Sequence, residues 1–186
     1  MSHDSVLSAL NALSKTRVYH TVPEEHVHHL IGETSRARII LNGSAIEHML
    51  AHRLEQMMPS LNSDEHSRIF GPDGPLGTFA NKTRIAKGLG IIDRTTSKQI
   101  DVIRAMRNAA AHCVTPISFA DKPLKDGVLQ IAPCNLRPQI KLLEAGALRD
   151  YFELTCMSIN SLLISGNPHE SDEDRLQTVL SGVLPS

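Results

Sequence analysis

Aromatic residues are scarce in this chain of 186 residues, where they make up 3% of the sequence and include no tryptophan. Proteins that recognise single-stranded RNA by stacking its bases need several exposed aromatic rings. This composition therefore disfavours a base-stacking surface.

Cysteines and long apolar runs are also few. The three cysteines, Cys113, Cys134 and Cys156, lie far apart and form no Cys-x-x-Cys pair. Neither a disulfide framework nor a zinc ribbon is indicated, and a reducing compartment fits this usage. No run reaches the roughly 18 apolar residues that span a bilayer, and the N-terminus lacks the pattern of a signal peptide. We predict a cytoplasmic protein without a membrane partner.

The remaining composition is that of a globular domain, with 41% hydrophobic and 21% charged residues. Apolar residues recur at helical spacing from Leu30 to Met57, from Ile100 to Ala110 and from Leu143 to Leu163. These patterns predict an all-α protein, an up-and-down bundle of four to five helices.

The pattern also suggests a division of the chain. Residues 1–22 are predicted to form an N-terminal extension with a short amphipathic segment. Residues 23–165 are predicted to form the helical domain, and residues 166–186 an acidic tail with a weak helix.

Local signals mark where the predicted helices begin, break and end. Asn42-Gly43-Ser44 predicts a kink or a break in the first long helix, and Leu61–Pro75 is rich in turn residues. Thr95 or Thr96 is suited to cap the helix that ends near His112. Four prolines between Pro116 and Pro138 predict a long irregular loop before the last main helix, with one strand-like run at residues 127–131.

The net charge of −1 hides a basic segment. Seven cations and two anions lie between Lys82 and Arg107, which gives this stretch a net charge of +5. Such a segment attracts phosphates, and the candidate nucleic-acid-binding residues are Lys82, Arg84, Lys87 and Arg104. The alternative is a solvated helix face whose cations pair with the acidic tail near Asp172.

The basic segment ends in Arg104-Ala-Met-Arg107-Asn108-Ala-Ala-Ala-His112. Arg104, Asn108 and His112 are four residues apart and share one helix face, whereas Arg107 lies about 140° from His112 around the axis. Arginine can stabilise the charge of a five-coordinate phosphorus, and histidine can move protons near neutral pH. The candidate catalytic residues are therefore Arg107, Asn108, which would orient the imidazole, and His112.

A purely structural role for these residues is the alternative, because an Arg-x4-His spacing alone is common. Arg107 would then pair with an acid such as Glu47, and His112 would cap its own helix. Glu47 could equally orient the active guanidinium of Arg104 or Arg107 from a neighbouring helix. The residues themselves leave these interpretations open.

The same segment bears on partners and metals. The small side chains of Ala109, Ala110 and Ala111 would let a second copy approach, so we predict a homodimer with a shared cleft. His48 and His52 have the helical spacing of two zinc ligands but no evident third ligand. We predict neither a metal nor a cofactor.

Two stretches carry a family resemblance. They are Gly74-Pro-Leu-Gly-Thr-Phe-Ala-Asn-Lys-Thr-Arg-Ile-Ala-Lys-Gly-Leu-Gly-Ile-Ile-Asp93 and Arg104–His112. They resemble the mannitol-repressor (MtlR) family and are similar to the wider HEPN superfamily of helical domains, with a weaker match at Ile39–Leu54. The HEPN resemblance implies a ribonuclease motif, Arg-x4–6-His, that acts across a dimer. The motif corresponds here to Arg107, Asn108 and His112.

The resemblance implies two functions. A HEPN-type endoribonuclease would cleave RNA without a metal, leave 2′,3′-cyclic phosphate ends, and act as a toxin or defence effector with a neutralising antitoxin. A protein similar to the mannitol operon repressor would instead be a non-enzymatic transcriptional regulator that works through a transcription-factor partner. Asn108 favours the nuclease, because the mannitol-repressor members can carry an acid at that position.

Overall fold

A computed structural model of the chain describes residues 3–14 and 34–165. Over these residues it is entirely helical, which confirms the predicted all-α class, although it has eight helices where four or five were expected. None of these helices is long and apolar enough to span a membrane. The helices are α1 (His3–Ser14), α3 (Thr34–Gln56), α4 (Ser63–Phe70), α5 (Phe79–Gly88), α6 (Arg94–His112), α7 (Lys122–Ile131), α8 (Arg137–Ile140) and α9 (Ala145–Ser165).

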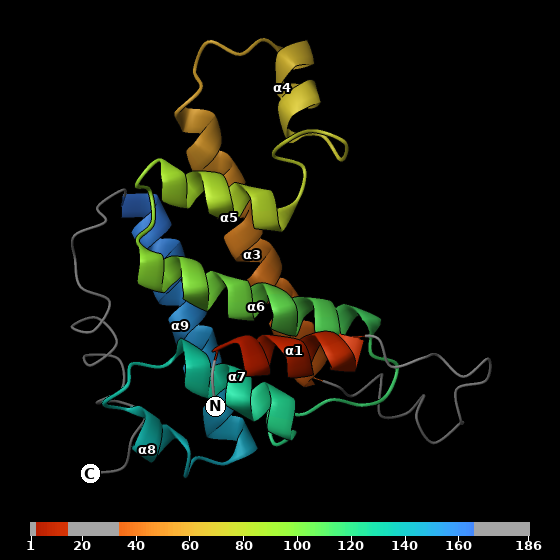
Figure 1. Cartoon of the computed structure of the whole chain (residues 1–186), viewed down its shortest axis with the longest axis vertical. Helices are drawn as coiled ribbons and strands as arrows, with labels where there is room; N and C mark the ends of the chain where they lie inside the picture. Colours follow the sequence, from red (N-terminus) through yellow and green to blue (C-terminus); the bar gives the residue numbers. More distant parts are fainter. Residues whose placement is uncertain (1–2, 15–33, 166–186) are drawn as a thin grey trace.

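The helices form two layers that cross each other (Figure 1). Helices α3 and α9 pack side by side in one layer, and α5, α6, α1 and α7 run across them. Helix α6 contacts α1, α3, α5 and α7, so it lies at the centre of the bundle. Helix α4 stands apart at one end, beyond the end of α3 (Figure 1).

The core is built from apolar stripes at helical spacing. Helix α3 buries one face through residues four or seven positions apart, and α6 and α9 bury most of their length against it. Full burial of each large aliphatic side chain contributes about 1.5–3 kcal/mol before entropic costs. The completely buried members include Ile39, Ile46, Leu50 and Leu54 of α3, Ile100, Ile103 and Met106 of α6, and Phe152 and Cys156 of α9.

Helix α1 belongs to this core, although its residues fall within the predicted N-terminal extension. Val6 and Leu10 are completely buried, and α1 packs against α6 and α7. Gly127 of α7 permits the close approach, because a Cβ there would lie 3.0 Å from the sulfur of Met106 and 3.6 Å from Leu10 Cδ1. The remainder of the predicted extension and the predicted acidic tail lie outside the described residues.

Two sequence predictions about irregular segments were wrong. Helix α3 continues through Asn42-Gly43-Ser44 without a break, and α7 is helical where a strand-like run was predicted at residues 127–131. Pro123 sits in the first turn of α7, where its missing N–H breaks no helical hydrogen bond. The prolines of this segment therefore begin a helix rather than exclude one, which shortens the predicted irregular loop.

Local capping explains the helix starts that the apolar pattern did not locate. Asn62 begins α4 with a capping box, in which its side chain accepts from the backbone of Glu65 and the Glu65 carboxylate accepts from the Asn62 N–H, each at 3.0 Å. Asp93, and not Thr95 or Thr96, caps α6, since its carboxylate accepts from the Thr96 N–H at 2.7 Å.

Candidate functional site

Arg107 lies where α6 crosses α3, opposite a glycine of α3 that lets the two helices approach closely. Gly43 of α3 faces Arg107 so closely that a Cβ on Gly43 would lie 2.9 Å from Arg107 Cβ and 3.0 Å from its Cγ. A larger residue would have to displace the base of the arginine side chain. Gly43 therefore fixes where the Arg107 side chain leaves its helix.

Glu47, one turn further along α3, binds two cations from two other helices. Its Oε2 lies 3.4 Å from Arg107 Nη2, and its Oε1 accepts from Lys82 Nζ of α5 at 3.0 Å. This confirms the predicted pairing of Glu47 with Arg107. We call Lys82, Glu47 and Arg107 the Glu47 cluster. Two positive charges share one carboxylate, so the Glu47 cluster keeps a formal charge of +1.

The members of the Glu47 cluster differ in their access to solvent. The side chains of Lys82, Glu47 and Arg107 are 10%, 20% and 31% exposed. The sequence marked Lys82 as a nucleic-acid contact, but the structure places its ammonium group inside the cluster, on Glu47. Arg107 is the member that reaches the surface most.

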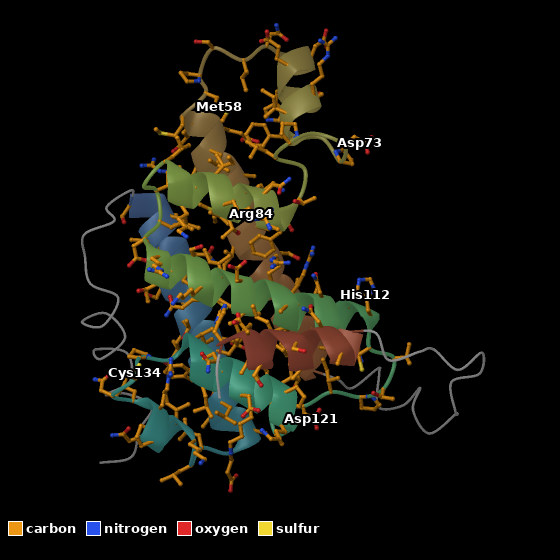
Figure 2. All side chains as sticks on the ribbon, viewed as in Figure 1. Met58, Asp73, Arg84, His112, Asp121 and Cys134 are labelled. Atoms are coloured by element: carbon orange, nitrogen blue, oxygen red, sulfur yellow. The ribbon has the colours of Figure 1, made fainter. Side chains whose placement is uncertain are left out.

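His112 is the last residue of α6 and is exposed at its end (Figure 2). Among the described residues its ring forms no hydrogen bond or ion pair. No contact therefore supports the alternative in which His112 caps its own helix. Arg36 of α3 holds this end instead. Its guanidinium donates to the carbonyl oxygens of Ala110 and Cys113, and to that of Thr115 at 2.7 Å.

Because α6 is regular up to His112, the predicted helical geometry applies. Arg104, Asn108 and His112 follow one stripe, and the Cα atoms of Arg107 and His112 are about 7.5 Å apart along the axis and about 140° apart around it. Asn108 is half-buried, and among the described residues its side chain forms no hydrogen bond. The structure therefore shows no bond by which Asn108 would orient the His112 imidazole.

The alanine triplet before His112 mostly faces this chain's own core. Ala109 and Ala110 are completely buried, and only Ala111 is exposed. Two of the three residues that were expected to admit a second copy are thus covered by helices of the same chain. A second copy could contact this turn only at Ala111 and at the exposed side chains around it.

The other predicted cations gather in a separate depression between α1, α5 and α6. We call it the basic groove; it has a volume of about 520 Å³. Arg84 and Lys87 of α5 and Arg104 of α6 line it, and Leu7 of α1 contributes an apolar wall. The sequence singled out these three cations, but nothing in it linked them to Leu7, which lies more than 70 residues earlier.

Metal-binding side chains are dispersed in the described part of the chain. No three His, Cys, Asp or Glu side chains there lie close enough together to hold an ion. The His52 ring nitrogen Nε2 lies 3.1 Å from the Gln56 amide nitrogen, within its own helix. Burial raises the pKa of the Cys156 thiol well above its ordinary value, which makes it a poor nucleophile at neutral pH.

Comparison of the chain with family models found no match, and comparisons with curated proteins and with solved structures found none either. The resemblance of residues 74–112 to the mannitol-repressor and HEPN families therefore stays a prediction.

Proposed function

We propose that this protein is a metal-independent endoribonuclease that uses Arg107 and His112. The observation that carries the proposal is the way in which Arg107 is held, charged and exposed. Gly43 fixes the base of the Arg107 side chain, and its guanidinium pairs with Glu47 in a cluster with an unbalanced positive charge. The side chain is 31% exposed, on a helix that ends in an imidazole without a partner among the described residues.

The guanidinium would stabilise the reacting phosphate. When the ribose 2′-oxygen attacks the adjacent phosphorus, negative charge builds up on the two non-bridging oxygens of the five-coordinate intermediate. Arg107 can donate two parallel N–H bonds to those oxygens. Since Lys82 also binds Glu47, the carboxylate remains paired when Arg107 turns toward a phosphate.

His112 would move the protons of the same reaction. The 2′-OH loses a proton, the bond from phosphorus to the 5′-oxygen breaks, and that oxygen takes up a proton, which leaves a 2′,3′-cyclic phosphate and a 5′-hydroxyl end. An imidazole can serve as the base or as the acid. One chain presents one His112 at this helix end, so we propose that a homodimer supplies the second proton-transfer group.

The cellular role we propose is that of a toxin or defence effector in the cytoplasm. An uncontrolled ribonuclease harms its host, so this role requires a neutralising antitoxin. A partner that covers Arg107 and His112 would supply that control.

A non-enzymatic regulator is the second candidate, and one observation favours it. Arg107 is already ion-paired with Glu47 in the described structure, as expected of a residue that holds helices together. In that case the protein, like the mannitol-repressor family it resembles, would act through a bound transcription factor.

Cleavage of mixed RNA in the presence of a chelator separates the two candidates. We expect His112→Ala to lower the cleavage rate at least about a hundredfold, since general acid–base catalysis contributes about 10²–10⁴. Arg107→Lys should also lower it strongly, because it keeps the charge but loses the two-pronged donor. His48→Ala, a change of an exposed histidine on α3, is the matched control and should cleave as the wild type.

The melting temperature of His112→Ala should equal that of the wild type, because the ring is exposed and forms no bond with any other described residue. Wild-type protein that cleaves none of the tested RNAs, or a His112→Ala variant that cleaves at the wild-type rate, would contradict the nuclease proposal. A transcription factor recovered with an inactive wild-type protein would support the regulator.

A further inference from the structure

The basic groove has no role in the chemistry proposed above. Its cations, Arg84, Lys87 and Arg104, line a depression of about 520 Å³, and the carboxylate of Asp101 lines it with them. The groove therefore has a formal charge of +2. Ser97 and Thr83 add hydroxyl groups to its lining.

The cations of the groove are available to a ligand. Arg84 and Lys87 are exposed and form no ion pair with any other described residue. Arg104 makes one contact, from Nη2 to Asp101 Oδ1 at 3.3 Å, and its Nε is buried without a hydrogen-bond partner in the described part of the chain. Its guanidinium therefore keeps hydrogen-bond donors that no described acceptor occupies.

Phosphate is the ligand chemistry that suits this lining. Two guanidinium groups and one ammonium group can surround a phosphate with charge-assisted hydrogen bonds. The wall formed by Leu7 lowers the local dielectric constant and so strengthens these bonds. Few aromatic rings are present to stack on a base, so the backbone of a nucleic acid, and not its bases, would be recognised.

The position of the groove suggests which phosphate it takes. Arg104 lies on the same stripe of α6 as His112, about 12 Å from it along the axis. That distance exceeds the rise of about 3.4 Å per nucleotide in a stacked strand. A strand whose reacting phosphate is near Arg107 and His112 could therefore place a phosphate several nucleotides away in the groove.

We infer that the basic groove binds backbone phosphates of single-stranded RNA at a distance from the bond that is cleaved. This inference rests on the proposed function for the identity of the strand. It assigns Arg84, Lys87 and Arg104 to substrate binding and leaves the chemistry to the end of α6.

Binding of an uncleavable RNA tests the inference without relying on activity. The probe is a fluorescent 2′-O-methyl oligoribonucleotide of about 12 nucleotides, a length within the usual range of single-strand sites. Its affinity for the full chain is measured at several salt concentrations. The Arg84→Ala/Lys87→Ala double variant should bind about tenfold more weakly, and its salt slope should fall by about 1.4, because each lost phosphate contact on a single strand removes about 0.7.

Two further variants control for non-specific effects. Arg94→Ala/Lys98→Ala removes the same two residue types from exposed positions on α6 outside the groove and should bind within about twofold of the wild type. Gly88→Leu adds bulk at the edge of the groove, where a Cβ meets no atom within 4 Å, and should weaken binding without a change of charge.

Equal losses in the two double variants, or no loss in either, would overturn the assignment. Competition by inorganic phosphate would also overturn it, if free phosphate displaces the probe as effectively, per phosphate group, as RNA does. The groove would then recognise a single ion and not a strand. If wild-type protein binds the probe through the groove but cleaves no RNA, the proposed function fails and the groove assignment stands. If it cleaves long RNA and the groove variants cleave as well as wild type at low substrate, only the groove assignment fails.

Discussion

The Glu47 cluster and the basic groove draw their cations from the same basic stretch of sequence, yet the fold treats them differently. In the Glu47 cluster, Lys82 and Arg107 converge on a carboxylate from α3 and are mostly covered. In the groove, Arg84 and Lys87 remain exposed, and the nearby Asp101 pairs with Arg104. The comparison shows that a run of positive charge does not reveal which cations are available; the acids brought by other helices decide it.

Removal of the Glu47 charge should produce the largest effect on stability. Glu47→Gln would leave the nearly buried ammonium of Lys82 beside Arg107 without a counter-charge. A broken buried pair costs about 3–5 kcal/mol, and the partial exposure of this one reduces the expected loss to about 2–3 kcal/mol. Denaturant unfolding of the variant measures it.

The double variant Glu47→Gln/Lys82→Met is the control for this prediction, because it removes the stranded cation as well. It should recover more than half of the lost free energy of unfolding. A double variant as unstable as Glu47→Gln alone would show that Lys82 does not depend on Glu47, and that the two regions differ less than their contacts imply.

A methyl group added at Gly43 should have the next largest effect. Gly43→Ala puts a Cβ 2.9 Å from Arg107 Cβ, so α3 and α6 must shift, and we expect a loss of about 1–2 kcal/mol together with slower RNA cleavage. Gly88→Ala at the groove meets no atom and should instead gain about 0.5 kcal/mol. Thermal unfolding of the two variants gives the comparison, and shifts of the same sign would contradict it.

Arg36 offers a smaller test at the end of α6. Arg36→Met removes the donors to three backbone carbonyls and should cost about 1 kcal/mol, since these groups can turn to water. Hydrogen exchange of the Cys113 amide, which bonds to Ala109 O, should become faster.

The matched control for Arg36 is Arg38→Met, which breaks an ion pair between the exposed Arg38 and the mostly covered Glu153 and should cost about 1 kcal/mol or less. Equal exchange of the Cys113 amide in both variants would mean that Arg36 does not hold the helix end that carries His112.

Long apolar repeats made most of the fold predictable. The end of α6 and the approximate range of α9 follow from residues such as Ile100, Ile103 and Leu163, whose burial drives the packing.

Two short helices were missed for different reasons. Helix α4 begins at the Asn62 capping box and buries none of its residues, so it has no apolar stripe. Helix α7 buries Leu124, Val128 and Ile131 at helical spacing, but the prolines around it favoured a loop. A capping-box search would have found α4, since Asn62 precedes Glu65 by three residues.

The candidate site was predictable in its chemistry but not in its geometry. The contact between Glu47 and Arg107 was one of two pairings considered, because an acid on a neighbouring helix is the usual partner of a half-buried arginine. The role of Gly43 was hidden, since the same residue in a sequence signals a helix break as readily as a close helix crossing. Arg36 was missed because its targets are backbone carbonyls, which leave no trace in side-chain patterns.

Removal of the Asp101 carboxylate from the groove should have the smallest effect on stability among these variants. Asp101→Asn breaks the 3.3 Å contact with Arg104, between side chains that are 35% and 29% exposed, so the free energy of unfolding should change by less than about 0.5 kcal/mol. The charge of the groove rises from +2 to +3, and binding of uncleavable RNA should become about two- to fivefold tighter at low salt. The gain should vanish as salt screens the added charge. A large loss of stability, or weaker binding, would show that Asp101 holds Arg104 in place as Glu47 holds Arg107, and the distinction between the two regions would disappear.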